Sequence, residues 1–361
     1  MTNAFLFFLL LIFSSNIILE NIHACNQSER SSLLLFSLTL SSPHLKLDFH
    51  QLLLLGGYNK LLDFSFNEFS GNISQGLGEC SKLPAFHAGH NNLSGLLPND
   101  IYNATTLEEI ALPHNSLYGA ISERIANLTN LSILDLNTNG LTGVLPKSIG
   151  KLSKLKLLLL QFNNLEGSVP PSLMNCTSLA ELNMGFKNLE GSISELNFAR
   201  LISLSKLDLG KNRLTGMFPV SLHFCKYLKA IRLSVNDLEE IQPDIQSLKF
   251  LSFLSLGYNR MINIAKAMKI LMHCKNLVVL SLSSNFVGEE FPDDLGVADF
   301  DGFQNLRMLA LGKCELTGQL PVWLPKLKKL KILGVGSNRI TGTIPSWLGT
   351  LPRLFFFKFG E

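Results

Sequence analysis

Three basic side chains lie in neighbouring segments of similar pattern and could bind an anion together. Lys206 opens the segment KLDL, Arg232 lies in the similar segment AIRL, and Lys211 falls between them. Ammonium and guanidinium groups donate charge-assisted hydrogen bonds, which an anionic group accepts. The alternative is an ordinary solvated face in which Lys206 pairs with Asp208 or Glu181, because exposed ion pairs contribute little energy. The other polar residues expected to bind ligand on this face are Asp208, Asn183, Gln161 and Asp135.

A second set of polar residues could carry glycans. Seven asparagines stand in N-x-S/T sequons, which accept N-linked glycans on exported chains: Asn26, Asn72, Asn92, Asn103, Asn127, Asn130 and Asn175. Asn103, Asn127 and Asn175 fall at the same place in a recurring pattern, so their glycans would share one lateral face. All seven lie before residue 178. The later part of the chain would therefore stay bare and open to partners.

Other reactive side chains give weaker predictions. His87, His90 and His114 could bind a metal or respond to pH, although exposed edge residues are the simpler interpretation. The acidic residues between Glu289 and Asp301 hint at a calcium loop, but Val297 stands where a third ligand is needed. Metalloprotease, nucleophile-elbow, P-loop and kinase motifs are all missing from the sequence. We therefore predict a binding protein rather than an enzyme, with no cofactor and no metal.

The elements that position these residues come from a repeat. The segment LSILDLNTNGLTGVLP, residues 131–146, recurs along the chain with leucines at fixed offsets before an asparagine corner. Most steps between corners are 23 to 26 residues, which is the period of a leucine-rich repeat solenoid. The corner positions are Asn67, Asn91, Asn115, Asn139, Asn163, Lys187, Asn212, Asn236, Asn259, Asn285, Cys314 and Asn338.

Each repeat predicts one short strand with a buried face. Leu134 and Leu136 should point inward, with Ile133, Asp135 and Asn137 outward, because side chains alternate along a strand. The corner asparagine can both donate to and accept from backbone groups, so stacked coils should form an asparagine ladder. Cys314 suits this corner. Lys187 does not, so we expect a looser corner there or substitution by Asn188.

The remainder of each repeat predicts a turn and a short helix. In residues 141–146 a glycine permits a bend, and the proline that follows removes a donor and should end regular pairing. The amphipathic stretch KSIGKLSKL then predicts a 3₁₀ turn or brief helix. The expected fold class is α/β: a leucine-rich repeat solenoid, a right-handed superhelix with a concave parallel β-sheet and convex 3₁₀ or short helices. The outward strand residues on the concave face form the default binding surface.

Six cysteines do not predict a disulfide framework. Cys80, Cys176, Cys225 and Cys274 each stand eleven residues before a corner, so they are a repeat feature and should be buried thiols. Cys176 and Cys225 lie two coils apart, farther than a disulfide reaches. We expect all six thiols to be reduced, with no C-x-x-C zinc site.

Composition and the N-terminal segment predict the cellular compartment of the protein. The apolar run FLFFLLLIF and the sequence Ile22-His23-Ala24 predict a cleaved secretory signal, with an uncleaved anchor as the alternative. The net charge of +3 does not favour nucleic acid, and the rest of the chain lacks an apolar run long enough to cross a membrane. The predicted organisation is a signal peptide at 1–24, a degenerate N-terminal cap at 25–56, and about twelve leucine-rich repeats plus a truncated one at 57–361.

Several segments resemble a particular family. They are ACNQSERSSLLLFSLTLSSP (24–43), AGHNNLSGLLPNDIYN (88–103), IGKLSKL (149–155), SLMNCTSLAELN (172–183), FVGEEFPDDLGVADFDGFQNLRML (286–309) and WLGTLPRLF (347–355). Together they resemble plant tyrosine-sulfated glycopeptide receptors and their kinase-less receptor-like relatives, a sister group of the phytosulfokine receptors. The resemblance implies a plasma-membrane receptor whose extracellular solenoid binds a small secreted peptide carrying sulfotyrosine. A co-receptor kinase would then dock, and a cytoplasmic kinase would signal.

The chain departs from that family at both ends. Residues 41–60 lack the Cys and Trp of the family's cap motif, and Glu361 falls inside a repeat, before the island insertion, membrane helix and kinase. We expect a truncated or partial gene product. Three functions stay open: a secreted or surface ligand-recognition module, a soluble inhibitor or decoy resembling the polygalacturonase inhibitors, and a product without function.

Overall fold

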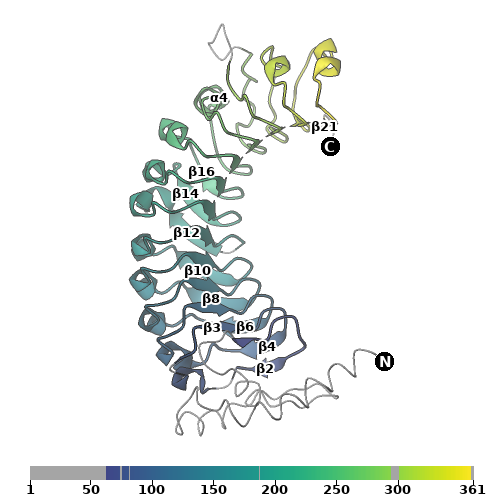
Figure 1. Ribbon diagram of the computed structural model, residues 1–361. Helices are drawn as coiled ribbons and strands as arrows, with labels where there is room; N and C mark the ends of the chain where they lie inside the picture. Colours follow the sequence, from purple (N-terminus) through teal and green to yellow (C-terminus); the bar gives the residue numbers. More distant parts are fainter. Residues whose placement is uncertain (1–61, 74, 81, 187, 294–300, 359–361) are drawn as a thin grey trace, which may run out of the picture. The chain divides into compact units, whose positions relative to one another are not determined.

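The computed structural model describes residues 62–73, 75–80, 82–186, 188–293 and 301–358. The chain divides into two compact units, residues 1–165 (unit 1) and 166–361 (unit 2). Within each unit, short parallel strands stack coil upon coil, with short helices on the opposite side of the coils (Figure 1). The predicted signal peptide, N-terminal cap and Asn26 lie outside the described residues. No helix among the described residues is long and apolar enough to cross a membrane.

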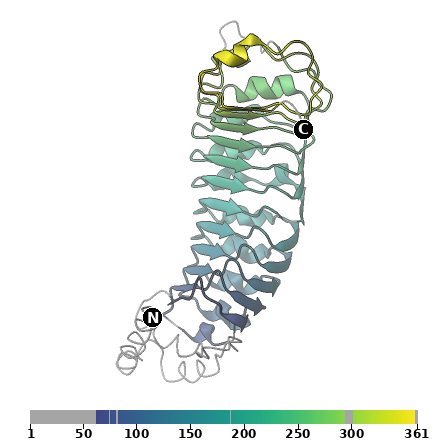
Figure 2. The same cartoon turned by 90° about the vertical axis from the view of Figure 1, so that its right-hand side faces the viewer.

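The leucine-bearing strands form a parallel main sheet in each unit (Figure 2). In unit 1 its strands are β1 (Leu62–Asp63), β3 (Ala85–His87), β5 (Glu109–Ala111), β7 (Ile133–Asp135) and β9 (Leu157–Leu159). In unit 2 they are β11 (Glu181–Asn183), β13 (Lys206–Asp208), β15 (Ala230–Arg232), β17 (Phe253–Ser255), β18 (Val279–Ser281), β19 (Met308–Ala310), β20 (Ile332–Gly334) and β21 (Phe356–Lys358). Leu134 and Leu136 are buried while Ile133, Asp135 and Asn137 are partly exposed, which confirms the predicted alternation.

A second parallel sheet follows the asparagine corners, and the sequence did not predict it. Its strands are β2 (Ser70–Asn72), β4 (Asn92–Gly95), β6 (Ser116–Gly119) and β8 (Gly140–Val144) in unit 1, then β10 (Asn164–Ser168), which begins at the end of unit 1, and β12 (Asn188–Ser192), β14 (Arg213–Gly216) and β16 (Asp237–Leu238) in unit 2. These strands end before the proline, as predicted: β8 stops at Val144 and β10 at Ser168. Gly71 and Gly167 adopt φ of 87° and 73° within paired strands, so the glycine permits the bend without ending the pairing.

Short helices complete the coils, as predicted. In unit 1 they are the 3₁₀ helices η1 (Leu77–Glu79), η2 (Asn99–Asn103), η3 (Glu123–Asn127) and η4 (Lys147–Lys151). In unit 2 they are η5 (Pro171–Asn175), η6 (Ile193–Glu195), η7 (Phe198–Arg200), η8 (Val220–Phe224), η9 (Pro243–Ser247), η10 (Leu324–Lys326), η11 (Ser346–Thr350) and the α-helix α4 (Ile264–Leu271). The side chain of Asn263 caps α4 by accepting from the Lys266 N–H.

The asparagine ladder is present in both units. The Asn139 side-chain nitrogen donates to the carbonyls of Leu112 and Leu136 at 2.9 and 3.1 Å, and its oxygen accepts from the Leu117 N–H at 3.0 Å. One side chain thus satisfies three backbone groups that belong to two successive coils. The buried Cys314 thiol contacts the Leu282 carbonyl oxygen at 3.7 Å, as its corner position predicted. Lys187 lies outside the described residues.

Asn188 does not take over the role of a corner asparagine. Asn188 is exposed at the first position of β12. Its side chain therefore does not take the turn position that the corner asparagines occupy, and the predicted substitution is wrong.

The described cysteines agree with the expectation of reduced thiols. They are Cys80, Cys176, Cys225, Cys274 and Cys314; all are buried, and no disulfide joins any two of them. Burial raises the pKa of the Cys176, Cys225 and Cys274 thiols to about 12. A protonated thiol inside the core behaves as a small apolar side chain. Cys25 lies outside the described residues.

Candidate ligand-binding site

Three neighbouring strands of unit 2 bring the predicted basic residues together. The parallel register sets Glu181 beside Lys206 in one row and Asn183, Asp208 and Arg232 beside one another in a second row. All five side chains occupy outward strand positions and are half-buried or exposed. The main sheet therefore presents alternating cations and carboxylates on the face that the leucines leave free.

Two ion pairs organise this face. The Lys206 Nζ lies 3.0 Å from Glu181 Oε2, and the Arg232 Nη1 lies 3.2 Å from Asp208 Oδ2. The alternative in which Lys206 pairs with Glu181 is therefore confirmed. The Lys206 side chain is 61% exposed and that of Arg232 is 29% exposed. The lysine pair is screened by water and weak, whereas the arginine is held more firmly.

A phenylalanine that the sequence analysis did not select joins the cluster. The Phe186 ring centroid lies 4.5 Å from the Lys211 Nζ and 4.7 Å from the Arg232 Cζ. An aromatic face attracts cations, so the ring helps to fix both charges. Phe186 directly precedes a corner and has φ of 59°.

The sequence carried a signal for this residue. The same position before a corner holds rings elsewhere: Phe66, His90, His114, Phe162 and Tyr258, each with a positive φ. This aromatic recurrence could have identified Phe186.

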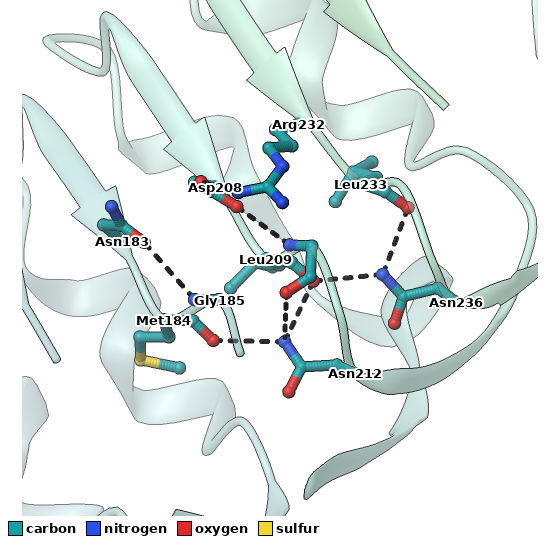
Figure 3. Close-up of polar contacts among 10 residues, drawn as sticks. Asn183, Met184, Gly185, Asp208, Leu209, Asn212, Arg232, Leu233 and Asn236 are labelled. Atoms are coloured by element: carbon teal, nitrogen blue, oxygen red, sulfur yellow. Dashed lines mark hydrogen bonds and ion pairs between the residues drawn. The ribbon is translucent and has the colours of Figure 1, made fainter. Parts of the chain in front are cut away.

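The ladder beneath the cluster holds it in place. Asn212 donates to the carbonyls of Met184 and Leu209 at 3.1 and 2.9 Å, and Asn236 donates to that of Leu209 at 3.0 Å (Figure 3). Gly210 lets the arginine lie close to the turn, since a Cβ there would stand 3.2 Å from the Arg232 Nε. The Gly210 N–H also donates to Asp208 Oδ1 at 2.9 Å. The cluster is therefore preorganised by backbone geometry.

The charges of the cluster leave an excess of one cation. Lys206, Lys211 and Arg232 contribute three positive charges, and Glu181 and Asp208 contribute two negative ones. The described ion pairs do not include Lys211. An anionic group approaching the ring could accept hydrogen bonds from Lys211 and from the N–H groups of Arg232 that face away from Asp208.

Two predicted site residues belong to unit 1 and are described there. Asp135 Oδ1 accepts from the backbone and side-chain nitrogens of Asn137 at 3.1 and 2.6 Å. Gln161 is partly exposed, and its buried Oε1 has no partner among the described residues. The cluster described above is accordingly built from unit 2.

Three sequon asparagines lie at the same position of their repeats, as the pattern predicted. Asn103, Asn127 and Asn175 are the exposed last residues of η2, η3 and η5. An arginine bonds the side-chain oxygen at two of them, Arg124 to Asn103 at 2.7 Å and Arg200 to Asn175 at 2.6 Å. N-linked glycans attach to the side-chain nitrogen, which these bonds do not involve.

The other sequons lie in different surroundings. Asn72 and Asn92 belong to strands of the second sheet. Asn130 is half-buried, and its nitrogen donates to the Thr105 carbonyl at 2.9 Å. The sequons therefore differ in how freely they expose the attachment atom.

The histidines and acids take structural roles. His90 stacks between Phe66 and His114 with ring centroids 4.3 Å apart on both sides, and the His87 Nε2 lies 2.9 Å from Glu109 Oε2. The Glu289 carboxylate accepts the two backbone N–H groups at the start of α4. Asp294 and Asp299 lie outside the described residues, and the described residues hold no cluster of metal-ligating side chains.

Family and sequence comparisons agree with this architecture. The Leucine Rich Repeat family model matches residues 130–152, 154–176, 203–225 and 329–351. Over 45 residues, the chain is 48% identical to Receptor-like protein 3 of Arabidopsis thaliana, a match that covers 12% of this chain and 6% of that protein.

Solved structures with the same fold include plant receptors. The plant peptide hormone receptor RGFR1, in complex with RGF2, matches with a TM-score of 0.75 and 29% identity over 82% of this chain and 46% of that one. The Arabidopsis receptor kinase HAESA, in complex with the peptide hormone IDA and the co-receptor SERK1, matches with a TM-score of 0.66 and 27% identity. That match covers 83% of this chain and 53% of HAESA, so the chain spans about half the length of these receptor structures.

Proposed function

We propose that this chain, a leucine-rich repeat protein of the plant receptor-like type, is an extracellular ligand-recognition module for a small secreted peptide. The observation that carries the proposal is the preorganised cluster of Lys206, Lys211, Arg232 and Phe186 on the main sheet of unit 2. Peptide-bound receptors of the same fold support the choice of ligand class. The plasma-membrane exterior or the secreted fraction is the corresponding location.

The chemistry of the cluster favours an anionic peptide group. Its excess positive charge suits a sulfated tyrosine or a carboxylate, and the Phe186 ring offers an apolar surface beside the cations. Asn183 and Asp208, which lie beside the cluster in unit 2, would supply further hydrogen bonds to a peptide. We favour sulfotyrosine, since its ring and its sulfate would use both the Phe186 ring and the cations.

The proposal assigns binding without catalysis. A co-receptor kinase is the second partner that we propose, by analogy with the HAESA complex that contains SERK1. Nucleic acid is not an expected partner, because the net charge is only +3.

Calorimetric titration with paired peptides tests the proposal. The probes are a synthetic peptide carrying one sulfotyrosine and the same peptide carrying tyrosine. We expect the sulfated peptide to bind more tightly, and Arg232→Glu to weaken its binding by at least about tenfold, because reversal places a carboxylate beside the incoming anion. Arg213→Glu is the matched control, since Arg213 is an exposed arginine of the second sheet.

Three results would contradict the proposal: equal affinity for both peptides, no affinity for either, or equal loss in the control variant. Inhibition of a polygalacturonase by the chain, in the absence of peptide binding, would instead favour the soluble-inhibitor function.

A further inference from the structure

One lateral position of unit 2 changes its chemistry in two successive coils. This position, here called the lateral slot, directly precedes the buried leucine that enters each main strand. In the later coils it holds Asn276, Asn305 and Lys329. Each bonds the preceding coil: Asn276 to the Lys249 carbonyl at 2.7 Å, Asn305 to that of Lys275 at 2.9 Å, and Lys329 to the side chain of Asn305 at 2.6 Å. A polar residue in the lateral slot therefore finds its hydrogen-bond partner in the preceding coil.

Tyr227 and Phe250 occupy the lateral slot in the two coils before these. Their side chains are 62% and 53% exposed, and their rings stack with centroids 6.3 Å apart and planes 18° apart. Ile202, in the preceding coil, is 60% exposed. Large exposed aromatic side chains in adjacent coils add little to a core and are enriched where proteins meet.

Lysines surround the two rings. Lys226, Lys249 and Lys275 each stand directly before the lateral slot of successive coils, in the sequences KYL, KFL and KNL. The register of β15, β17 and β18 sets these coils side by side. Lys229 follows on the other side of Tyr227, and all four lysines are exposed. None of them belongs to an ion pair between described residues.

This arrangement has no evident benefit for folding. Like charges in register on adjacent coils repel one another, and each exposed ring leaves apolar area in water. Some exposed cations of unit 2 are neutralised, as in the pairs Lys206–Glu181 and Arg339–Glu315, whereas these four lysines have no ion-pair partner among the described residues. The uncompensated lysines around two rings therefore point to a ligand from outside the chain.

We propose that this patch, formed by Lys226, Tyr227, Lys249 and Phe250 with Lys229 and Lys275 at its rim, docks an acidic segment of a partner protein. Carboxylates of the segment would pair with the lysines, and an apolar side chain between them would cover the two rings. Charge complementarity determines this choice of occupant, since only an anionic partner relieves the repulsion among the lysines. Aromatic residues at the centre and charges at the rim are the arrangement of an interaction hot spot.

The patch is separate from the proposed peptide site. Tyr227 and Phe250 precede the main strands, whereas Arg232 and Phe186 lie on or after them. A chain that fails to bind sulfated peptide could therefore still bind an acidic segment here. The two proposals fail independently.

Fluorescence polarisation with two labelled nonapeptides tests the docking surface on the full chain. The probes are Glu-Glu-Glu-Glu-Trp-Glu-Glu-Glu-Glu and its analogue with every Glu replaced by Gln. We expect the acidic probe alone to bind, with an affinity that falls as salt rises. The double variant Lys226→Gln/Lys249→Gln and the double variant Tyr227→Ser/Phe250→Ser should each weaken binding by about tenfold or more.

A matched control separates the patch from general basicity. Lys151→Gln/Lys156→Gln removes two exposed lysines from unit 1 and should change the affinity less than about twofold. Circular dichroism melting of each variant verifies its folding. Equal loss in the control, binding of the glutamine probe, or no binding of the acidic probe would overturn the proposal. Displacement by polygalacturonate that depends on the lysines and not on the rings would assign the patch to an acidic polysaccharide and likewise overturn it.

Discussion

The same backbone positions carry opposite chemistry in two coils of unit 1 and in two coils of unit 2. In unit 1 the last residues of η2 and η3 are the sequon residues Asn103 and Asn127, and the lateral slot after η3 is Asn130. In unit 2 the last residue of η8 is the exposed Phe224, and the lateral slot holds Tyr227 and Phe250. One surface is polar and could be glycosylated, whereas the other is apolar and basic.

The difference shows what a repeat constrains. Stacking requires the buried leucines and the corner asparagines, because each satisfies the core or the backbone of its coil. The described lateral positions lie at the surface of their coils and are free to vary. Neighbouring parts of a repeat array can therefore acquire separate binding surfaces without any change of fold.

The largest expected effect is a loss of stability on removing a ladder asparagine. Asn285 and Asn91 each donate to a carbonyl of the preceding coil and of their own coil and accept from a backbone N–H. Asn285 is buried at 1% exposure, whereas Asn91 is half-buried. We expect Asn285→Ala to lower the free energy of unfolding by about 3–5 kcal/mol and Asn91→Ala by about 1–2 kcal/mol, because water can replace only the exposed partners. Urea unfolding followed by circular dichroism measures both losses. Equal losses would show that burial does not distinguish the ladders of the two units.

The second prediction concerns the stability of unit 2 at alkaline pH. Burial raises the pKa of Cys176, Cys225 and Cys274, all in unit 2, from 9.0 to about 12. Thiols that ionise more easily when unfolded stabilise the fold fully below pH 9, and this contribution is lost as the pH rises from 9 to about 12. We expect the melting temperature to fall over that window and Ellman's reagent to react with the three thiols only as unit 2 opens. Rapid reaction at pH 8 in the folded chain would contradict the burial of these thiols.

The third prediction concerns glycan occupancy at the sequons of unit 1. On secreted protein we expect glycans at the exposed Asn103 and Asn127, and several-fold lower occupancy at the half-buried Asn130. A glycan there would compete with the hydrogen bond from Asn130 to the Thr105 carbonyl, which contributes on the order of 1 kcal/mol. Glycopeptide mass spectrometry measures all three sites. An unmodified chain, or equal occupancy at the three sites, would remove the distinction.

The smallest expected effect concerns the ion pairs on the two main sheets. Glu109→Gln in unit 1 and Glu181→Gln in unit 2 should each change the free energy of unfolding by less than about 1 kcal/mol, because water reaches both pairs at least in part. Chemical denaturation of both variants provides the measurement. A loss of several kcal/mol in unit 2 alone would mean that its cluster stabilises the fold rather than awaiting a ligand.

Sequence reasoning recovered the parts of the molecule that repeat. It predicted the main strands, the asparagine ladder, the short helices and the buried thiols, because each occupies a fixed offset in every coil. It did not predict the second sheet, since the segment between the corner asparagine and the proline was interpreted only as a turn. Phe186 was not predicted as a site residue, because a phenylalanine before a corner asparagine looks like an ordinary loop residue in the sequence. Its contacts with Lys211 and Arg232 are visible only in the structure.

The sequence by itself determined the coil and the kinds of residue that face solvent, because burial and turn geometry impose a period on the chain. Only the tertiary structure decided which side chains meet: Lys206 pairs with Glu181, and Arg232 lies against both Asp208 and Phe186. These partners belong to different coils, so their contact depends on the register between coils. No local segment of sequence encodes that register, because it arises only when the coils stack.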